Sequence, residues 1–472
     1  MVLSLVTRHK PEADTAVPLT GESFRQESAG REMAYALHRH QKVPFFELGQ
    51  MSGFTLPPVN LSDLLFDTLN LQNTQDGRMK VLQELMLSAL SQSILGFHNQ
   101  LPGIFVASDS AANAAAVKVA YEICKDKVRP DESMSILSSS LSHRSAHQAA
   151  FRFEHHSIPV DRESFRMNSN KVLEQLNNKV LLLHLTAGTT DLGIVEELPE
   201  EILKRAKELG VWVHVDACYG AFNIGLLPES EGIPTQIARF QKLLHSPYVD
   251  SIAVDLHKFI GPYNGACLLF PGRNAIPFTD QASYFENVSA LGGTTIGARP
   301  IAMALDSMKR LGLMGMRLLA VEKLNEARAL AQYFSDVEIE PIVPPTSGMV
   351  AASMASEAEA SGVRELLKRY RVNCAQVKLE GPDYKVDGLR FVLPPRLYFH
   401  TEPLKAIADL TQQCRDIHRG RRTGVDIRPF EELIFGIQSP GAFAPPLFSS
   451  RDKAALKKLY IYIYIDAKLI IG

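Results

Sequence analysis

A lysine and a histidine stand side by side between two apolar runs in "SIAVDLHKFIGPYNGACLLF", residues 251–270. Most lysines at strand ends place the charged tip in water while the stem packs on apolar neighbours. A buried lysine behaves differently, because desolvation lowers its pKa and the neutral amine can form a Schiff base with a carbonyl group. Lys258 is therefore a candidate nucleophile, provided that other reactive residues join it.

Two stretches place acidic and hydroxyl side chains directly after other apolar runs. Asp216 ends the run in "VHVDACYGA", where it is either a helix cap or surface aspartate, or a buried carboxylate that needs a cationic partner. Ser108, Asp109 and Ser110 lead into an alanine-rich helix. Hydroxyls and free amides at such a helix start bind an anion or simply cap the helix.

Two further stretches add an imidazole and hydroxyl groups. His143 in "SHRSAHQAA" is either a ligand or a structural histidine, and Thr186 in "LTAGTTDLG" belongs to a site or to a simple turn. Together, the stretches supply a lysine for an aldehyde, a carboxylate for a ring nitrogen, an aromatic face and a phosphate cradle. Pyridoxal phosphate is the cofactor that needs all four.

The elements that must position these residues alternate between short apolar runs and helical stretches from about residue 101 onward. The apolar runs are "GIFVAS", "MSIL", "KVLLLHLT", "VWVHVD", "DSIAVD" and "GACLLF". Strands that are apolar throughout and separated by helices predict an α/β domain with a mostly parallel sheet covered on both faces. Ligands collect at the carboxyl ends of such strands, which is where the candidate residues lie.

The chain has 472 residues and a mass of 52.2 kDa, which favours two domains or one large domain with an appendage. We predict an N-terminal arm and helix over residues 1–100, a large domain over 101–330 and a small α+β domain over 331–472. The alternating tyrosine and isoleucine of "LYIYIYIDAKLIIG" predicts a strand or an adhesive tail.

Composition and charge limit the classes of partner that the protein is expected to bind. With 50 basic and 52 acidic residues, the net charge of -2 gives no electrostatic reason to expect nucleic acid or an anionic membrane. The five cysteines are scattered and form no C-x-x-C pair, which favours a reducing compartment and no metal site. No apolar run is long enough to span a membrane, and no signal peptide is evident, so we expect a cytoplasmic protein that binds a small molecule.

In chain order, these motifs resemble the group II pyridoxal-phosphate-dependent decarboxylases, a family of glutamate, aromatic amino acid and histidine decarboxylases with sphingosine-phosphate lyase as a related branch. The resemblance spans roughly residues 44–312, and "HVDA" and "HK" are its most specific elements. It implies a large domain with the fold of type I pyridoxal-phosphate-dependent transferases. It also implies a homodimer with shared active sites.

The resemblance implies roles for individual residues. Lys258 forms the Schiff base, Asp216 keeps the pyridine nitrogen protonated, and His143 stacks on the ring. The other implied cofactor contacts, at the phosphate, the phenolic oxygen and the ring faces, are Ser108, the backbone of Asp109, Ser110, Thr186, Cys218, Asp255 and His257. Asp109 departs from the family's small residues, and an acidic side chain beside a phosphate is repulsive unless it turns away.

The implied activity is decarboxylation of an amino acid through a quinonoid intermediate, which releases carbon dioxide and an amine. Three alternatives stay open: a carbon–carbon lyase of the sphingosine-phosphate lyase type, an aminotransferase that uses Arg390 for the substrate carboxylate, and a non-catalytic relative that keeps the fold. The sequence does not identify the substrate or the proton donor. Tyr284 is a candidate for lining the substrate pocket.

Overall fold

The computed structural model of the protein describes residues 46–47, 77–124, 133–150, 153–228, 234–261, 264–272, 298–370, 372–393 and 401–426. The chain divides into two compact units, residues 1–46 and 47–472. Before residue 77 the structure describes only the two-residue strand β1 (Phe46–Glu47). All elements discussed below belong to the second unit. Tyr284, the N-terminal arm and the tyrosine- and isoleucine-rich tail lie outside the described residues.

The larger of the sheets has seven strands, in the order β2-β8-β7-β6-β5-β3-β4. Their bounds are β2 (Gly103–Val106), β3 (Ser135–Ser139), β4 (Glu154–Ile158), β5 (Val180–Thr186), β6 (Trp212–Asp216), β7 (Ser251–Asp255) and β8 (Ala266–Leu269). The pairings between β4, β3, β5, β6 and β7 are parallel, whereas β8 runs antiparallel to both of its neighbours. The sheet is therefore mostly parallel, as predicted.

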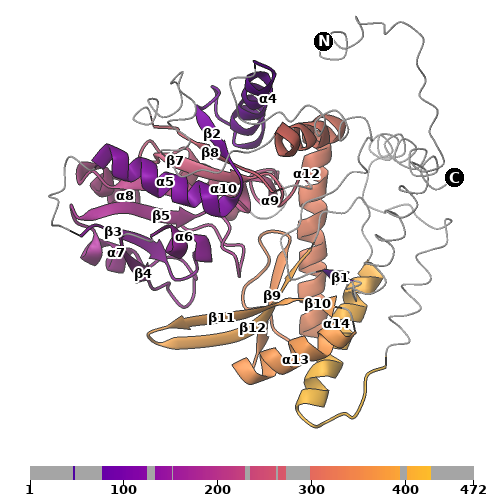
Figure 1. The fold of residues 1–472 in the computed structure, drawn as a ribbon. Helices are drawn as coiled ribbons and strands as arrows, with labels where there is room; N and C mark the ends of the chain where they lie inside the picture. The colour runs from indigo at the N-terminus through magenta and orange to yellow at the C-terminus, as the bar shows by residue number, and fades with distance from the viewer. Residues whose placement is uncertain are drawn as a thin grey trace, which may run out of the picture. The chain divides into compact units, whose positions relative to one another are not determined.

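Helices alternate with these strands along the chain (Figure 1). The described helices are α4 (Gly77–Ser88), the π-helical turn η1 (Ala89–Ile94), α5 (Asp109–Cys124), α6 (Arg144–Ala149), α7 (Ser169–Gln175), α8 (Glu200–Glu208), α9 (Gly220–Asn223), α10 (Pro234–Leu244), α12 (Ala298–Asp336), α13 (Glu357–Arg369) and α14 (Thr401–His418). The alternation confirms the predicted α/β fold class.

Both faces of the large sheet are buried, because successive residues of its strands join two separate apolar clusters. In β7, Ile252 and Val254 pack in the cluster that includes α8, α10 and α12, whereas Ala253 packs in the cluster of α5. Side chains of a strand point alternately to opposite faces. Burial on both sides explains why the strands are apolar throughout, and it leaves the strand ends as the place for polar groups.

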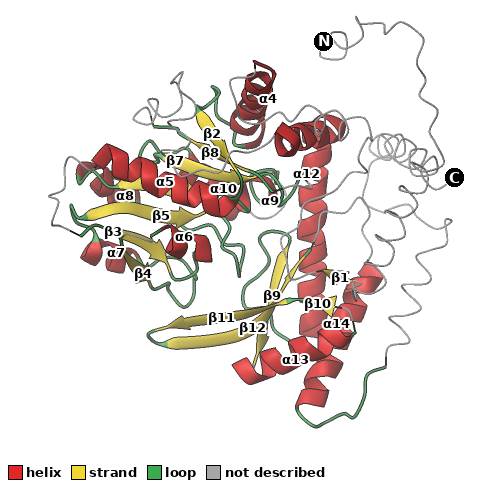
Figure 2. Cartoon of the chain, in the orientation of Figure 1, coloured by secondary structure: helices red, strands yellow, loops and turns green. Residues whose placement is uncertain are grey.

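The part of the chain after residue 336 forms a smaller antiparallel sheet in the order β11-β12-β9, with α13 and α14 (Figure 2). Its strands are β9 (Met349–Met354), β11 (Ala375–Gly381) and β12 (Tyr384–Val392), and β10 (Val372–Asn373) lies between α13 and β11 in the chain. The long helix α12 connects the two sheets and contains one non-helical residue, Gly312, with φ +62°. The predicted domain boundaries at residues 100 and 330 stay predictions.

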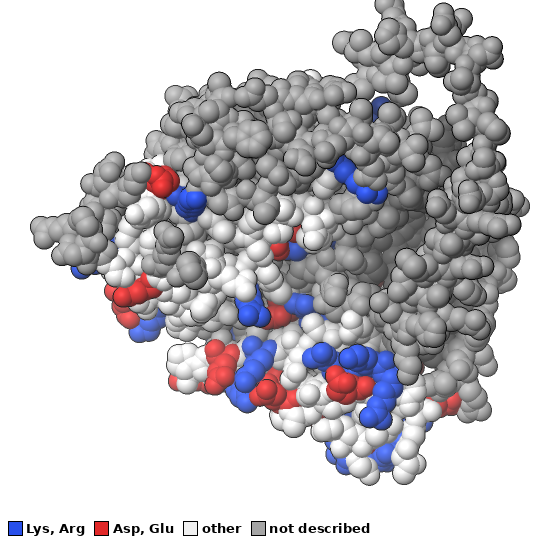
Figure 3. Space-filling view, in the orientation of Figure 1, with Lys and Arg blue, Asp and Glu red and all other residues white. Residues whose placement is uncertain are grey.

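Opposite charges are intermixed on the surface of the smaller sheet and its helices. Figure 3 shows lysine and arginine beside aspartate and glutamate on this face. Lys378 and Lys385 both lie within 4 Å of Glu357, for example. Within the described residues, no helix combines the length and the apolar character that crossing a membrane requires.

Candidate active site

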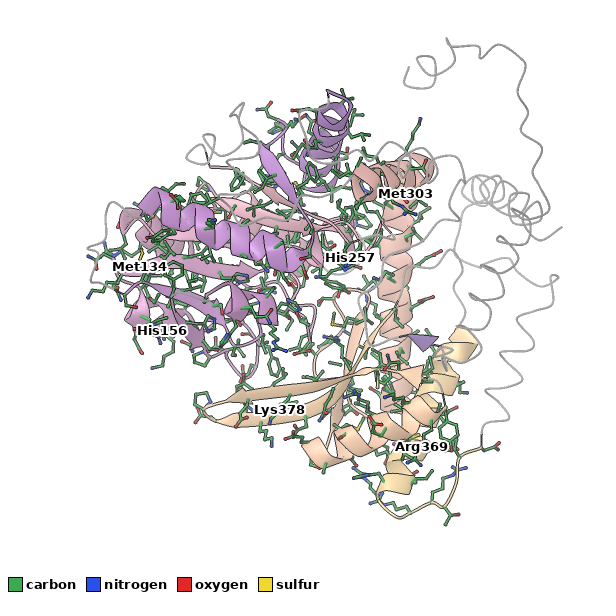
Figure 4. The ribbon with its side chains drawn as sticks, viewed as in Figure 1. Met134, His156, His257, Met303, Arg369 and Lys378 are labelled. Atoms are coloured by element: carbon green, nitrogen blue, oxygen red, sulfur yellow. The ribbon has the colours of Figure 1, made fainter. Side chains whose placement is uncertain are left out.

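The candidate residues gather at the carboxyl ends of the parallel strands. Lys258 follows β7 by three residues, and its side chain is 12% exposed. The Nζ atom of Lys258 donates a hydrogen bond to Asp109 Oδ2 at 2.9 Å and lies 3.7 Å from Asp255 Oδ2. Figure 4 shows the neighbouring residue, His257, close to the end of α5 where Asp109 stands. Two segments almost 150 residues apart thus share one ion pair.

The structure corrects one expectation about Lys258. Burial by itself lowers the pKa of this ammonium, but the nearby charges, first Asp255 and then Asp109 and Asp216 among others, outweigh burial, and the net pKa is raised. Sequence reasoning counted the burial and not the carboxylates. Lys258 is therefore protonated in this arrangement. The neutral amine can form only if the charge of the surrounding carboxylates changes.

Asp109 is the first residue of α5, and its carboxylate is largely buried. Asp109 Oδ1 accepts hydrogen bonds from the Ser110 amide at 2.6 Å and from Ser110 Oγ at 3.3 Å. Burial raises the pKa of Asp109, but the Lys258 ammonium lowers it by more, so the carboxylate stays ionised. Ser108 caps the same helix, since its Oγ accepts from the Ala111 amide at 3.2 Å.

Asp216 ends β6 and has a defined donor for each oxygen. Asn113 Nδ2 donates to Oδ2 at 3.0 Å, and the Cys218 amide donates to Oδ1 at 3.0 Å. Burial raises the pKa of Asp216, yet His184, Lys258 and these two donors together hold it well below its ordinary value. The carboxylate is thus ionised at neutral pH, and it influences the pKa of Lys258, which places both groups in one electrostatic neighbourhood.

His143 is connected to Asp216 through two side chains. His143 Nδ1 lies 2.8 Å from Ser145 Oγ, and Asn113 Nδ2 donates to the same Ser145 Oγ at 2.8 Å. Since Asn113 also donates to Asp216, one amide joins the predicted stacking residue to the predicted ring-nitrogen partner. These contacts fix the orientation of the His143 imidazole.

A buried histidine, His214, holds the side chain of Asn113 in place. His214 Nε2 lies 2.9 Å from Asn113 Oδ1, and His214 Nδ1 lies 2.8 Å from Ser251 Oγ. Burial lowers the pKa of His214 to about 3, so its imidazole is neutral and one ring nitrogen donates while the other accepts. Asn113 is therefore held at both ends of its amide.

Thr186 ends β5 directly beside Asp216, with which it is in register. The Thr186 amide donates to Glu196 Oε2 at 2.7 Å, and its Oγ1 lies 3.3 Å from Ser142 Oγ. The loops after β5 and β6 meet closely at Gly220, where a Cβ would lie 1.8 Å from the Ala187 carbonyl oxygen. This close approach keeps the two strand ends together.

The remaining candidates lie at the edges of the same site. His257 Nδ1 is 2.5 Å from Asp255 Oδ1, which also accepts from the His257 amide at 2.8 Å. Cys218 is 1% exposed, and burial raises its thiol pKa well above the ordinary value. A protonated thiol of this kind packs as an apolar group and has no nucleophilic role.

Arg390 is engaged by the loop after β5. Arg390 Nη1 donates to the Thr190 carbonyl at 2.7 Å and to Asp191 Oδ1 at 3.1 Å. The guanidinium of Arg390 is therefore already paired with a carboxylate of the chain. The aminotransferase alternative instead requires a guanidinium that can bind the substrate's carboxylate. The contact also ties β12 of the smaller sheet to the end of β5.

A cavity of about 440 Å³, with His143 in its lining, opens near the ends of β3 and β4. Its lining residues are serine, histidine, arginine and glutamine: Ser138, Ser139, Ser140, Ser142, His143, Arg144, His147, Gln148, His155 and Ser157. Burial, together with the neighbouring histidines, lowers the pKa of His155 to about 4. The described residues contain no group of three or more potential ligands arranged for a metal ion.

The site fits pyridoxal phosphate unequally at its two ends. At the end of Asp216 and His143, an ionised carboxylate with fixed donors and an oriented imidazole suit a protonated aromatic nitrogen and its ring. At the end of α5, Asp109 already supplies an anion where the cofactor's phosphate is expected. Sequence reasoning named Asp216 and His143 but missed the supporting residues Asn113 and Ser145. An asparagine isolated among alanines in "SAANAAA" was the available signal.

Comparisons with known proteins show which proteins the chain is similar to. Residues 103–283 match the family model "Pyridoxal-dependent decarboxylase conserved domain". A probable L-tyrosine/L-aspartate decarboxylase of Methanocella arvoryzae is 27% identical over 198 residues, which cover 41% of this chain and 50% of that protein. The aligned region thus spans half of that relative's length.

Solved structures show the same fold at low identity. Sphingosine-1-phosphate lyase of Burkholderia pseudomallei superposes with a TM-score of 0.62 and 18% identity, covering 92% of this chain and 97% of that chain. Oryza sativa TDC, solved with PLP and tryptamine, gives a TM-score of 0.67 and 15% identity, covering 88% of this chain and 91% of that chain.

Proposed function

We propose that the chain is a member of the group II pyridoxal-phosphate-dependent decarboxylases and releases carbon dioxide from an amino acid with pyridoxal phosphate as cofactor. The observation that supports the proposal most directly is that Lys258 follows β7 and Asp216 ends the neighbouring, parallel strand β6. One supplies the amine that bonds to the cofactor's aldehyde, and the other supplies the charge that suits its ring nitrogen.

The chain's own residues perform three tasks in this proposal. Asp216, oriented by Asn113 and the Cys218 amide, would keep a proton on the cofactor's ring nitrogen. His143, held by Ser145, would lie against the ring. Lys258 would pass a proton from Nζ to a nearby carboxylate, Asp109 or Asp255, before that nitrogen could bond to carbon. The bound cofactor itself supplies the sink for the electron pair that the departing carboxylate leaves behind.

Assembly and location belong to the same proposal. We expect a homodimer in the cytoplasm. Val81 and Leu85 on α4 and Met314 on α12 are between 48% and 67% exposed, and α4 contacts α12. Exposed apolar side chains of this kind are typical of surfaces that associate. The five cysteines are all buried and free of disulfides, which agrees with a reducing compartment.

The test is a screen of amino acids for carbon dioxide release by the purified protein with added pyridoxal phosphate. The screen begins with L-tyrosine and L-aspartate, which the name of the Methanocella arvoryzae relative specifies. Lys258→Ala should lower the rate by at least about 10³-fold and abolish the visible absorbance of lysine-bound cofactor. Carbon dioxide release that survives this substitution would rule out the assignment of Lys258.

The products separate the alternatives. An aldehyde formed by carbon–carbon cleavage of a phosphorylated amino alcohol would favour the lyase alternative, and a keto acid would favour an aminotransferase. Cofactor uptake without any product from these substrates would favour the non-catalytic relative. Light scattering coupled to size-exclusion chromatography tests the dimer, and a monomer with full activity would contradict shared active sites.

A further inference from the structure

Asp109 has the partners that an anionic ligand of this site would take. Its Oδ1 accepts from the Ser110 amide at the amino end of α5, and its Oδ2 accepts from the Lys258 ammonium at 2.9 Å. A helix start offers free amides and the positive end of the helix dipole to an anion. Here, a carboxylate from the chain itself already uses both the amide and the cation.

The next amides of α5 are also engaged within the helix start. The Ala111 amide donates to Ser108 Oγ at 3.2 Å, and the Ala112 amide donates to the Ser108 carbonyl at 3.0 Å. A phosphate at this position must therefore replace existing contacts, and Asp109 is the group whose charge conflicts with it. Moving the Asp109 side chain away would free the Ser110 amide and Lys258 together.

The charges around Lys258 increase this conflict. Asp109 and Asp255 lie within 4 Å of its Nζ, and Asp216 adds a third negative charge to the same neighbourhood. A phosphate monoester brings a charge of about -1.5 to -2 at neutral pH. Like charges at short range in a partly buried site repel strongly, because water screens them little.

We propose that the Asp109 carboxylate occupies the amino end of α5, where the cofactor's phosphate would bind, and retains Lys258 as an ion-paired ammonium, and thereby sets the affinity of the protein for phosphorylated cofactor. Asp109 is thus a specificity-determining residue for the phosphate group. The inference rests on the proposed function only in taking pyridoxal phosphate as the ligand, since binding is measured without any substrate.

The test compares wild-type protein with Asp109→Asn and Asp109→Glu. The asparagine has nearly the shape of aspartate without its charge, and the glutamate keeps the charge. Dissociation constants are measured by titrating each protein with pyridoxal phosphate and, separately, with pyridoxal, which has no phosphate. Thermal unfolding checks that all three proteins fold.

Asp109→Asn should bind pyridoxal phosphate at least tenfold more tightly than wild type. The ratio of the pyridoxal constant to the pyridoxal phosphate constant should also increase, because pyridoxal is affected only through Lys258. Inorganic phosphate should compete with pyridoxal phosphate at lower concentration in this variant than in wild type. Asp109→Glu should show neither gain.

Each other result overturns the inference. Equal gains for pyridoxal and pyridoxal phosphate in Asp109→Asn would mean that Asp109 acts on Lys258 alone. Equal gains in Asp109→Asn and Asp109→Glu would mean that shape, and not charge, is responsible. Tight binding of pyridoxal phosphate that none of the variants changes would leave the proposed function standing without this inference, whereas binding by none of the three proteins would remove both.

Discussion

Asp216 is buried and Asp109 is partly buried; both are ionised aspartates at the same edge of the sheet, but their oxygens have different partners. Each Asp216 oxygen accepts from a neutral donor, Asn113 Nδ2 or the Cys218 amide. Its negative charge is therefore oriented and still available to a cation. Asp109 instead accepts from a helix amide and from the ammonium of Lys258, so its charge is already neutralised within the chain.

The difference shows that a carboxylate in a site predicts the charge of a ligand only when the carboxylate's own hydrogen-bond and ion-pair partners are known. Neutral donors around Asp216 leave a net negative charge, which favours a protonated ring nitrogen. A cation beside Asp109 leaves no net charge, and any added phosphate must break that pair. In the proposed function, the charge of Asp216 suits the cofactor's ring nitrogen, whereas the charge of Asp109 is already paired with Lys258.

Asp216→Asn should have the largest effect on this comparison. The substitution removes the charge that holds a proton on the ring nitrogen, and we expect kcat/KM for carbon dioxide release to fall about 10²- to 10³-fold. Lys258 still binds the cofactor, so the absorbance of lysine-bound cofactor should persist. The measurement is steady-state kinetics on cofactor-loaded protein.

A matched variant separates charge from packing in that experiment. Asp216→Glu keeps the charge and should retain more activity than Asp216→Asn, even if both unfold at a lower temperature. Near wild-type activity in Asp216→Asn would mean that the ring nitrogen needs no charged partner. The distinction between the two ends of the site would then fail.

Glu196→Gln gives a smaller effect, on stability and its pH dependence. Burial raises the pKa of Glu196 to about 7, from 4.5 for an exposed glutamate, although the Thr186 amide lowers it. The stabilising contribution of the neutral carboxyl is complete below pH 4.5 and is lost between pH 4.5 and 7, by about 3 kcal/mol at most. Glutamine cannot ionise, yet its amide oxygen still accepts from the Thr186 amide.

The expected outcome is a difference in unfolding free energy, variant minus wild type, that grows from pH 4.5 to 7 and stays constant above. Urea unfolding at several pH values measures it. Glu196→Ala serves as the control, because it loses both the charge and the acceptor and should be destabilised even at low pH. If the difference in unfolding free energy for Glu196→Gln does not change with pH, the pKa of Glu196 is not raised by burial.

Much of the fold was predictable from the sequence because burial on two faces makes strands apolar throughout. The strands of "VWVHVD" and "DSIAVD" are examples. The edge strand β4 was missed, since "EHHSI" is polar and half exposed. Exposure at a sheet edge removes the apolar signal that prediction uses.

Some features of the candidate site could be predicted from the sequence, and others could not. Lys258, Asp216 and His143 follow apolar runs, so their positions at the sheet edge could be predicted. The pairing of Lys258 with Asp109 could not, because it depends on β2 and β7 being brought together across β8. The sign of the Lys258 pKa shift depends first on Asp255 and then on Asp109 and Asp216 among others, so counting burial alone gave the wrong sign. The residues' roles toward the cofactor stay predictions.

Ser108→Ala should give the smallest effect and sharpens the comparison at the phosphate end. Ser108 Oγ accepts from the Ala111 amide, so its loss leaves one amide of α5 without its cap. Removing such a cap costs about 1 kcal/mol of unfolding free energy. Urea unfolding should show this cost for Ser108→Ala and little of it for Ser108→Thr, which keeps a hydroxyl.

Because the charge of Asp109 is unchanged in Ser108→Ala, the affinity of this variant for pyridoxal phosphate should change less than that of Asp109→Asn. A larger affinity change in Ser108→Ala would make the cap, and not the carboxylate, the group that limits access of the phosphate to α5.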